Sequence, residues 1–175
     1  MNTRRVAYSA FLLLGLGAAS AAEARVQLRL MPGYSGYVRV RGGQHDLYEG
    51  WSFGGRLMFT RGKAGLFFVG YRSLKAQTNY LLIPDPEYTD QFVDIGYRRM
   101  LGRNAFFEIA GTGVSSKSDS KSGFGFGGSF GGGLQFMLGK RLVLGVTTQY
   151  SVVQGPVSGD QRRMLTQSAD VGVNF

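Results

Sequence analysis

Apolar and polar residues alternate along most of this 175-residue chain, and most clearly in its final stretch, Leu165–Phe175. One side of that stretch is apolar except at Gln167, and its members are Leu165, Ala169, Val171, Val173 and Phe175. Because successive side chains of a β-strand point to opposite faces, a period of two indicates a strand. The chain is therefore predicted to end in a strand with one apolar and one polar face.

The same alternation predicts seven more strands, at residues 26–40, 51–60, 65–74, 90–101, 105–114, 123–138 and 141–152. Four connections between the strands are expected to be long, at residues 41–50, 75–89, 115–122 and 153–163. The other three are short turns, around Gly62, Gly102 and Gly139. Long and short connections alternate in this way in membrane barrels, and the strands reach the ~9–11 residues needed to cross a bilayer at a tilt.

The two faces of these strands differ in chemistry. The polar face carries glycines and eight charged residues, namely Arg29, Arg39, Arg56, Arg72, Arg98, Asp94, Glu108 and Asp170. The other face is aliphatic, with aromatic residues near both ends of the strands, as at Trp51 and Phe136. A water-soluble barrel would place its apolar face inside, but aromatic belts around an aliphatic band are typical of a lipid-facing surface. The sequence predicts an all-β, eight-stranded antiparallel up-and-down transmembrane β-barrel.

The amino terminus has the three parts of a secretory signal peptide. Arg4 and Arg5 precede an apolar segment, and small residues follow it, so cleavage is expected after Ala22 or Ala24. The apolar segment is shorter than the ~20 residues of a membrane-spanning helix. Residues 1–22 are thus predicted to be removed, leaving 23–175 as one barrel domain. The net charge of +9 could suggest nucleic acid, but an exported chain without a basic stripe argues against that partner.

Taken together, the eight strands and the terminal strand ending in Phe175 resemble the small OmpA/OmpX-type family of bacterial outer-membrane β-barrels. The resemblance covers the whole chain after the signal peptide. It implies an integral protein of the outer membrane with periplasmic termini and no cofactor. It also implies contact with outer-membrane lipids, and with the barrel-assembly machinery, which recognises the terminal Phe in that family.

The eight charged residues of the polar face are the first candidate site, a charge network inside the barrel. An eight-stranded barrel is only wide enough inside for side chains, so buried charges there must be paired or hydrated. A packed polar core, a narrow and weakly anion-selective water path and a pocket for an anionic group all fit this pattern. The inner face of strand 123–138 consists largely of glycine, which leaves space for Arg56 on the opposite wall.

Catalytic and metal sites are not predicted. A lipid-A-modifying enzyme would need a Ser beside an acid–base partner, but no Ser, including Ser35, Ser52 and Ser73, has a motif spacing from His45. His45 is therefore interpreted as a solvated loop residue. Tyr80, Leu81, Leu82 and Ile83 form an apolar run that could contact a partner, unless the flanking strands extend and pair there.

The resemblance and the residues together favour a non-enzymatic integral outer-membrane β-barrel. Its expected role is in envelope integrity or in surface interaction through the extracellular loops, with an unidentified protein or surface as partner. A narrow, weakly anion-selective small-solute channel is the alternative, and a lipid-A-modifying enzyme is third. The fold alone does not decide among them.

Overall fold

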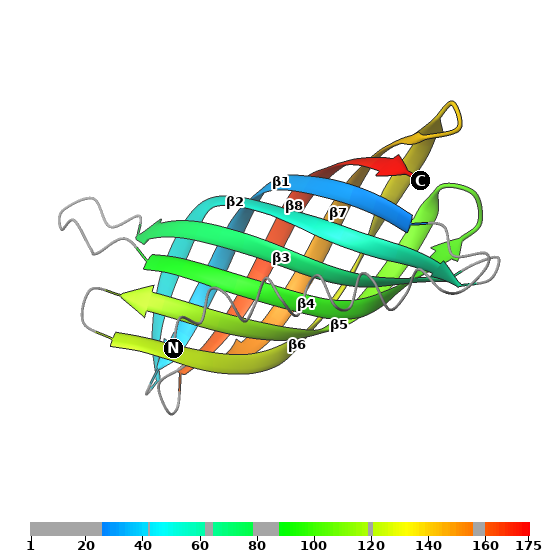
Figure 1. Ribbon diagram of the computed structural model, residues 1–175. Coiled ribbons are helices and arrows are strands. Elements are labelled where there is room, and N and C mark those ends of the chain that lie inside the picture. Colours follow the sequence, from blue (N-terminus) through cyan, green and yellow to red (C-terminus); the bar gives the residue numbers. More distant parts are fainter. Residues whose placement is uncertain (1–25, 42, 62–64, 79–87, 119–120, 156–159) are drawn as a thin grey trace, which may run out of the picture.

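The computed structural model describes residues 26–41, 43–61, 65–78, 88–118, 121–155 and 160–175 (Figure 1). The described chain consists of long, tilted strands. They are β1 (Val26–Arg41), β2 (Gln44–Arg61), β3 (Gly65–Thr78), β4 (Tyr88–Leu101), β5 (Ala105–Ser118), β6 (Lys121–Leu138), β7 (Leu142–Gln154) and β8 (Asp160–Asn174). No helix in these residues is long and apolar enough to cross a membrane. The predicted signal peptide and Tyr80–Ile83 fall outside the described residues.

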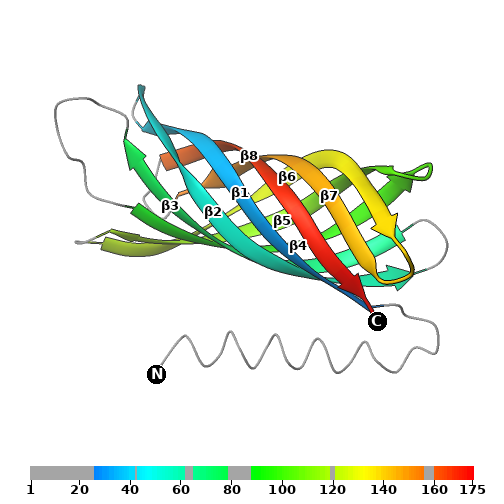
Figure 2. The ribbon, with the colours of Figure 1, turned by 90° about the horizontal axis from the view of Figure 1, so that it is seen from above.

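The eight strands form a closed antiparallel barrel in which each strand pairs with its neighbours in sequence. The terminal strand β8 pairs with β7 and also with β1, where Leu30 lies opposite Val171. The predicted fold class is thus confirmed. Figure 2 shows the carboxyl terminus at the end of the barrel where β2, β4 and β6 finish. We call this the turn end, and the opposite end the loop end.

The strands extend further at the loop end than the sequence analysis predicts. β1 continues to Arg41 and β2 begins at Gln44, while β5 continues to Ser118 and β6 begins at Lys121. β7 continues to Gln154 and β8 begins at Asp160. The expected long connections at 41–50, 115–122 and 153–163 are therefore wrong, as most of their residues belong to strands. The main-chain ladder needs no apolar side chains, so pairing continues where both faces of a strand become polar.

Two of the turn-end connections require glycine. Gly102 and Gly139 have φ values of +87° and +67°, in the left-handed region that residues with a side chain rarely adopt. Each follows directly on a strand, β4 or β6. These residues therefore reverse the chain within three residues, as predicted for short turns.

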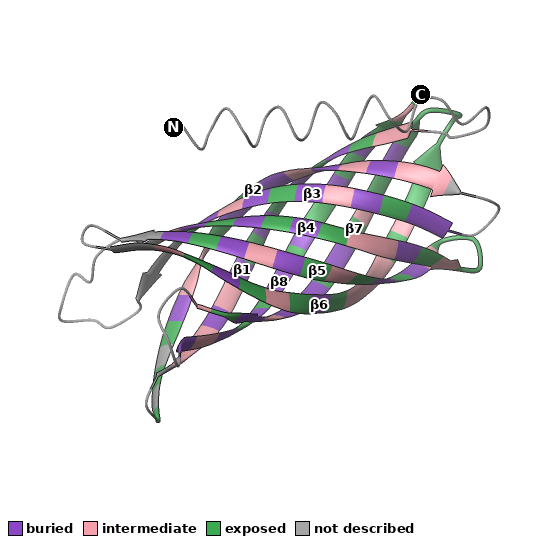
Figure 3. Ribbon diagram, turned by 60° about the horizontal axis from the view of Figure 1, so that its bottom comes forward, coloured by how far each residue is buried: buried purple, intermediate pink, exposed green. Residues whose placement is uncertain are grey.

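Burial alternates along the strands, with buried and exposed residues following one another on each ribbon (Figure 3). The exposed set is apolar and includes Trp51 at 74% exposure, Phe130, Ile95 and Val146. The buried set includes seven of the eight charged residues of the polar face, and Arg39 is partly buried. In water an apolar outer surface of this extent would be costly, so it indicates a barrel that faces lipid, as predicted.

Glycine dominates the inner face of β6, at Gly125, Gly127, Gly131 and Gly133. A Cβ atom built on Gly127 would lie 2.0 Å from the carbonyl oxygen of Val152 on β7, and one on Gly133 would lie 2.0 Å from that of Val146. β5 and β7 approach each other across this strand. The wall bends tightly at β6, and glycine at these positions permits the bend.

Candidate functional site: the charged interior of the barrel

The centre of the interior is organised around Glu108 on β5. Arg56 Nη1, from β2, donates to both carboxylate oxygens of Glu108 at 2.9 Å. Arg98 on β4 donates to Glu108 Oε2 from Nε at 3.0 Å and from Nη2 at 2.9 Å. All three side chains are buried. One carboxylate therefore accepts hydrogen bonds from two guanidinium groups, in the short charge-assisted geometry that makes such bonds strong.

Asp170 on β8 is the second acidic centre. Its Oδ2 accepts from Arg29 Nη1 at 3.3 Å, from Arg98 Nη2 at 3.4 Å and from the hydroxyl of Thr147 at 2.9 Å. Arg29 lies directly opposite Arg56 in the β1–β2 register, a like-charge pairing that would destabilise the sheet on its own. Asp170 and Glu108 offset that repulsion from opposite sides.

Aromatic rings and amides complete the packing of the arginines. The guanidinium carbon of Arg98 lies 3.6 Å from the centroid of the Phe106 ring, and that of Arg56 lies 4.4 Å from that of Phe68. Arg56 Nη2 also donates to Gln149 on β7 at 3.0 Å. Arg56 thus reaches from β2 to side chains on both neighbours of the glycine-rich β6. We call Arg29, Arg56, Arg98, Asp94, Glu108 and Asp170 the central network.

Arg72 lies beside this network without an ion pair among the described residues. Its Nη1 donates to Thr166 at 2.7 Å and its guanidinium stacks on Phe92, whereas its buried Nε and Nη2 have no hydrogen-bond partner in the described structure. A cavity of about 10 Å³ touches Arg72 and Asp94. That volume accommodates roughly one water molecule, so a water bridging the two side chains fits this space.

A second group of ion pairs lies toward the loop end. Arg162 donates to Asp90 and, at 2.7 Å, to Ser116, and it lies 3.6 Å from Asp160. Arg39 Nε donates to Asp160 Oδ1 at 3.0 Å. With two arginines and two aspartates, this loop-end cluster has no formal net charge.

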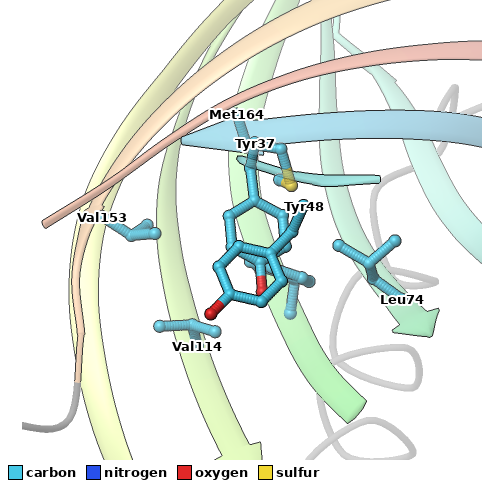
Figure 4. Packing of buried hydrophobic residues seen from close by; sticks show 7 residues of the cluster. Tyr37, Tyr48, Leu74, Val114, Val153 and Met164 are labelled. Atoms are coloured by element: carbon cyan, nitrogen blue, oxygen red, sulfur yellow. The ribbon is translucent and has the colours of Figure 1, made fainter. Parts of the chain in front are cut away.

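An apolar cluster lies against the loop-end ion pairs and crosses the interior (Figure 4). Tyr37 and Tyr48 lie opposite each other in the β1–β2 register, and their rings stack with centroids 4.9 Å apart. Arg162 lies over the Tyr37 ring at 6.0 Å. The other members are Leu74, Phe92, Val114, Val153 and Met164. Side chains from seven strands, all except β6, therefore meet across the loop-end half of the lumen and fill it.

The structure divides the eight charged residues of the polar face into three groups. Six form the central network, while Arg39 belongs to the loop-end cluster and Arg72 bonds a hydroxyl instead of a carboxylate. Sequence reasoning missed Asp160 and Arg162, because it placed residues 153–163 in a loop, and it left Asp90 out of the inward charges although Asp90 begins the predicted strand 90–101. Following the period of two back from Asp94 and from Asp170 would have found all three.

The predicted loop residue His45 lies on β2, opposite Val40, and is exposed on the outer face. The expectation of a loop position is therefore wrong. Ser35 and Ser52 are buried on the inner face, so the barrel wall separates them from His45. No group of three metal-ligating side chains gathers in the part of the chain that the structure describes.

Neither a protein-family model nor a curated protein matches the chain. Its fold is similar to that of solved outer-membrane barrels. Ail, the attachment invasion locus protein of Yersinia pestis in complex with the heparin analogue sucrose octasulfate, matches with a TM-score of 0.58 and 13% identity, over 87% of this chain and 99% of Ail. Neisserial surface protein A matches with a TM-score of 0.59 and 12% identity, over 87% and 97%.

The outer membrane protein OprG from Pseudomonas aeruginosa matches with a TM-score of 0.51 and 9% identity, over 85% of this chain and 95% of OprG. At these identities the likeness concerns the fold. The chain has the fold of the small eight-stranded outer-membrane barrels.

Proposed function

We propose that this chain is a non-enzymatic barrel of the bacterial outer membrane that acts at its loop end, in envelope integrity or in contact with a surface partner. The observation that carries the proposal is the filled interior. Ion pairs and stacked rings, such as Glu108 with its arginines and Tyr37 with Tyr48, occupy the lumen. A barrel filled in this way is a rigid scaffold that presents the segments joining its strands.

The solved structures of similar fold also support a role at the cell surface. Ail is named for attachment and invasion, and another neighbour is named as a surface protein. Both share the fold with this chain at low identity, so they suggest a class of role without naming a ligand. The apolar run at Tyr80–Ile83, in the connection between β3 and β4, is the proposed contact.

The proposed orientation places the loop end outside the cell and both termini in the periplasm. A protease-cleavable tag inserted after Asp119, between β5 and β6, should be cut on intact cells. The same tag after Gly62, between β2 and β3, should be cut only after the outer membrane is opened. The reverse pattern of cleavage would overturn the orientation.

Replacing Leu81, Leu82 and Ile83 together with Ser is expected to leave the barrel folded but to weaken surface binding by about tenfold or more, since a few clustered residues carry most of the energy of an interface. Adhesion of expressing cells to a surface coated with extracellular-matrix protein is the measurement, with detergent sensitivity of the same cells as the readout of envelope integrity. A gene deletion that changes neither property would contradict the proposal.

The filled lumen predicts that the refolded barrel gives no reproducible conductance steps in a planar bilayer. Arg56→Ala should remain silent as well, because the Tyr37–Tyr48 cluster still blocks the passage. Insertion must be verified independently, by resistance of the barrel to added protease. Anion-biased steps that change in Arg56→Ala would instead support the small-solute channel.

A further inference from the structure

The outer surface of the barrel carries a groove near its loop end. It crosses β7, β8, β1 and β2, has a volume of about 600 Å³ and is mostly apolar. Its apolar and aromatic lining consists of Tyr34, Val38, Val40, Leu47, Tyr150 and Leu165. Every one of these side chains belongs to the outward-facing set of its strand, so the groove opens away from the lumen.

The groove exists because one outward position lacks a side chain. Gly36 on β1 lies between Leu165 on β8 and Glu49 on β2 in the sheet register. A Cβ atom built on Gly36 meets no atom within 4 Å. Unlike the inner glycines of β6, Gly36 is therefore not required by the packing of the barrel, and its effect is to leave a notch in the outer wall.

The lining of the groove also includes one guanidinium group and one imidazole. Arg163 lies opposite Val38 and its Nε donates to Gln161 at 3.2 Å, and His45 lies opposite Val40. Among the described residues, no acidic side chain lines the groove. The nearest carboxylate in the register, that of Glu49, bonds the hydroxyl of Tyr34. An apolar floor with a guanidinium at its edge matches an acyl chain attached to a phosphorylated headgroup.

We propose that this groove binds one acyl chain of a phosphorylated glycolipid of the outer leaflet, of the lipid A class, with a phosphate at Arg163. The surrounding wall is the lipid-facing surface, and the volume is within the ~300–1,000 Å³ of small-molecule sites. The choice of the outer leaflet rests on the proposed orientation of the barrel. The tag experiment tests that orientation separately, whereas binding to the purified barrel does not depend on it.

Gly36→Leu is the decisive variant, because it adds a side chain to the notch at a position where a Cβ atom has no neighbour within 4 Å. Excluding about two methylene groups of an acyl chain should weaken lipid A binding roughly tenfold. Gly111→Leu is the matched control, since Gly111 is exposed on the outer face of β5 and its nearest atom lies 4.0 Å away. It should bind lipid A like the wild type.

Native mass spectrometry of the detergent-solubilised barrel, titrated with lipid A, measures the bound fraction. Arg163→Gln should weaken binding by no more than about fivefold, as expected for an exposed ion pair, and should not affect a dephosphorylated lipid A. Leu47→Ser removes part of the apolar wall without adding bulk and serves as the second variant if Gly36→Leu does not fold.

Three results would overturn the proposal. Folded Gly36→Leu and Leu47→Ser could both retain lipid A as the wild type does, which would place the lipid elsewhere. Arg163→Gln could leave the preference for phosphorylated over dephosphorylated lipid unchanged, which would remove the phosphate contact. Phosphatidylglycerol could bind as tightly as lipid A, which would make the groove a general acyl-chain site instead of a glycolipid site.

Discussion

Gly127→Ala is expected to prevent the barrel from folding, whereas Gly128→Ala, one residue further along the same strand, should fold like the wild type. A Cβ atom on Gly127 would lie 2.0 Å from the carbonyl oxygen of Val152, 2.5 Å from Val153 Cα and 2.7 Å from Val153 Cγ1. Two of these three atoms are backbone, which cannot rotate away, so β6 and β7 must separate. Overpacking typically costs about 1–3 kcal/mol and occasionally more, and a clash with fixed backbone atoms belongs at the upper end of that range.

The control is matched because Gly128 lies on the same strand but faces outward. A Cβ atom there would lie 3.6 Å from the carbonyl oxygen of Ala110, an ordinary contact. Refolding into detergent followed by gel electrophoresis without boiling measures the folded fraction, since folded barrels migrate differently from unfolded chains. Equal folded fractions for the two variants would show that the bend at β6 does not depend on glycine.

This bend illustrates what the sequence could and could not predict. The alternation of side chains predicts the strands, their faces and the closure by β8, because a period of two is a local property of the chain. It also predicts that the inner face of β6 consists largely of glycine and lacks side chains. It does not predict that β7 comes within contact of that face, since the curvature of the wall depends on all eight strands together.

The charged interior is a second feature that the sequence predicts only in part. The inward-facing charges could be identified from the alternation of faces along each strand alone. Arg56 reaches the space near β6 that the sequence analysis assigned to it. Their partners could not be identified. Arg98 and Asp170 meet across the lumen, and which residues face each other there depends on the stagger between the strands of the closed barrel. Asp160 and Arg162 of the loop-end cluster were missed for a simpler reason. They continue the alternation of β8 beyond the apolar band, where polar residues were interpreted as a loop.

The second large effect is expected at Glu108, whose carboxylate is shared by two arginines. Glu108→Ala leaves Arg56 and Arg98 without their closest acceptor, and both guanidinium groups remain buried. Removing one partner of a buried ion pair costs about 3–5 kcal/mol, and here a single substitution affects two pairs. The unfolding midpoint in urea should therefore fall sharply. Trp51, the only tryptophan, lies on the lipid-facing surface and reports unfolding by its fluorescence.

A double-mutant cycle separates the loss of charge balance from the loss of packing. Adding Arg98→Met to Glu108→Gln removes one of the two unpaired cations, while the methionine retains part of the apolar contact with Phe106. The double variant should therefore be more stable than the sum of the single losses predicts, by about 1–3 kcal/mol. Additive losses of unfolding free energy would mean that Glu108 contributes mainly by packing and not by its charge. A positive coupling would mean that one carboxylate holds the two arginines, and with them the walls of β2, β4 and β5, in a single arrangement.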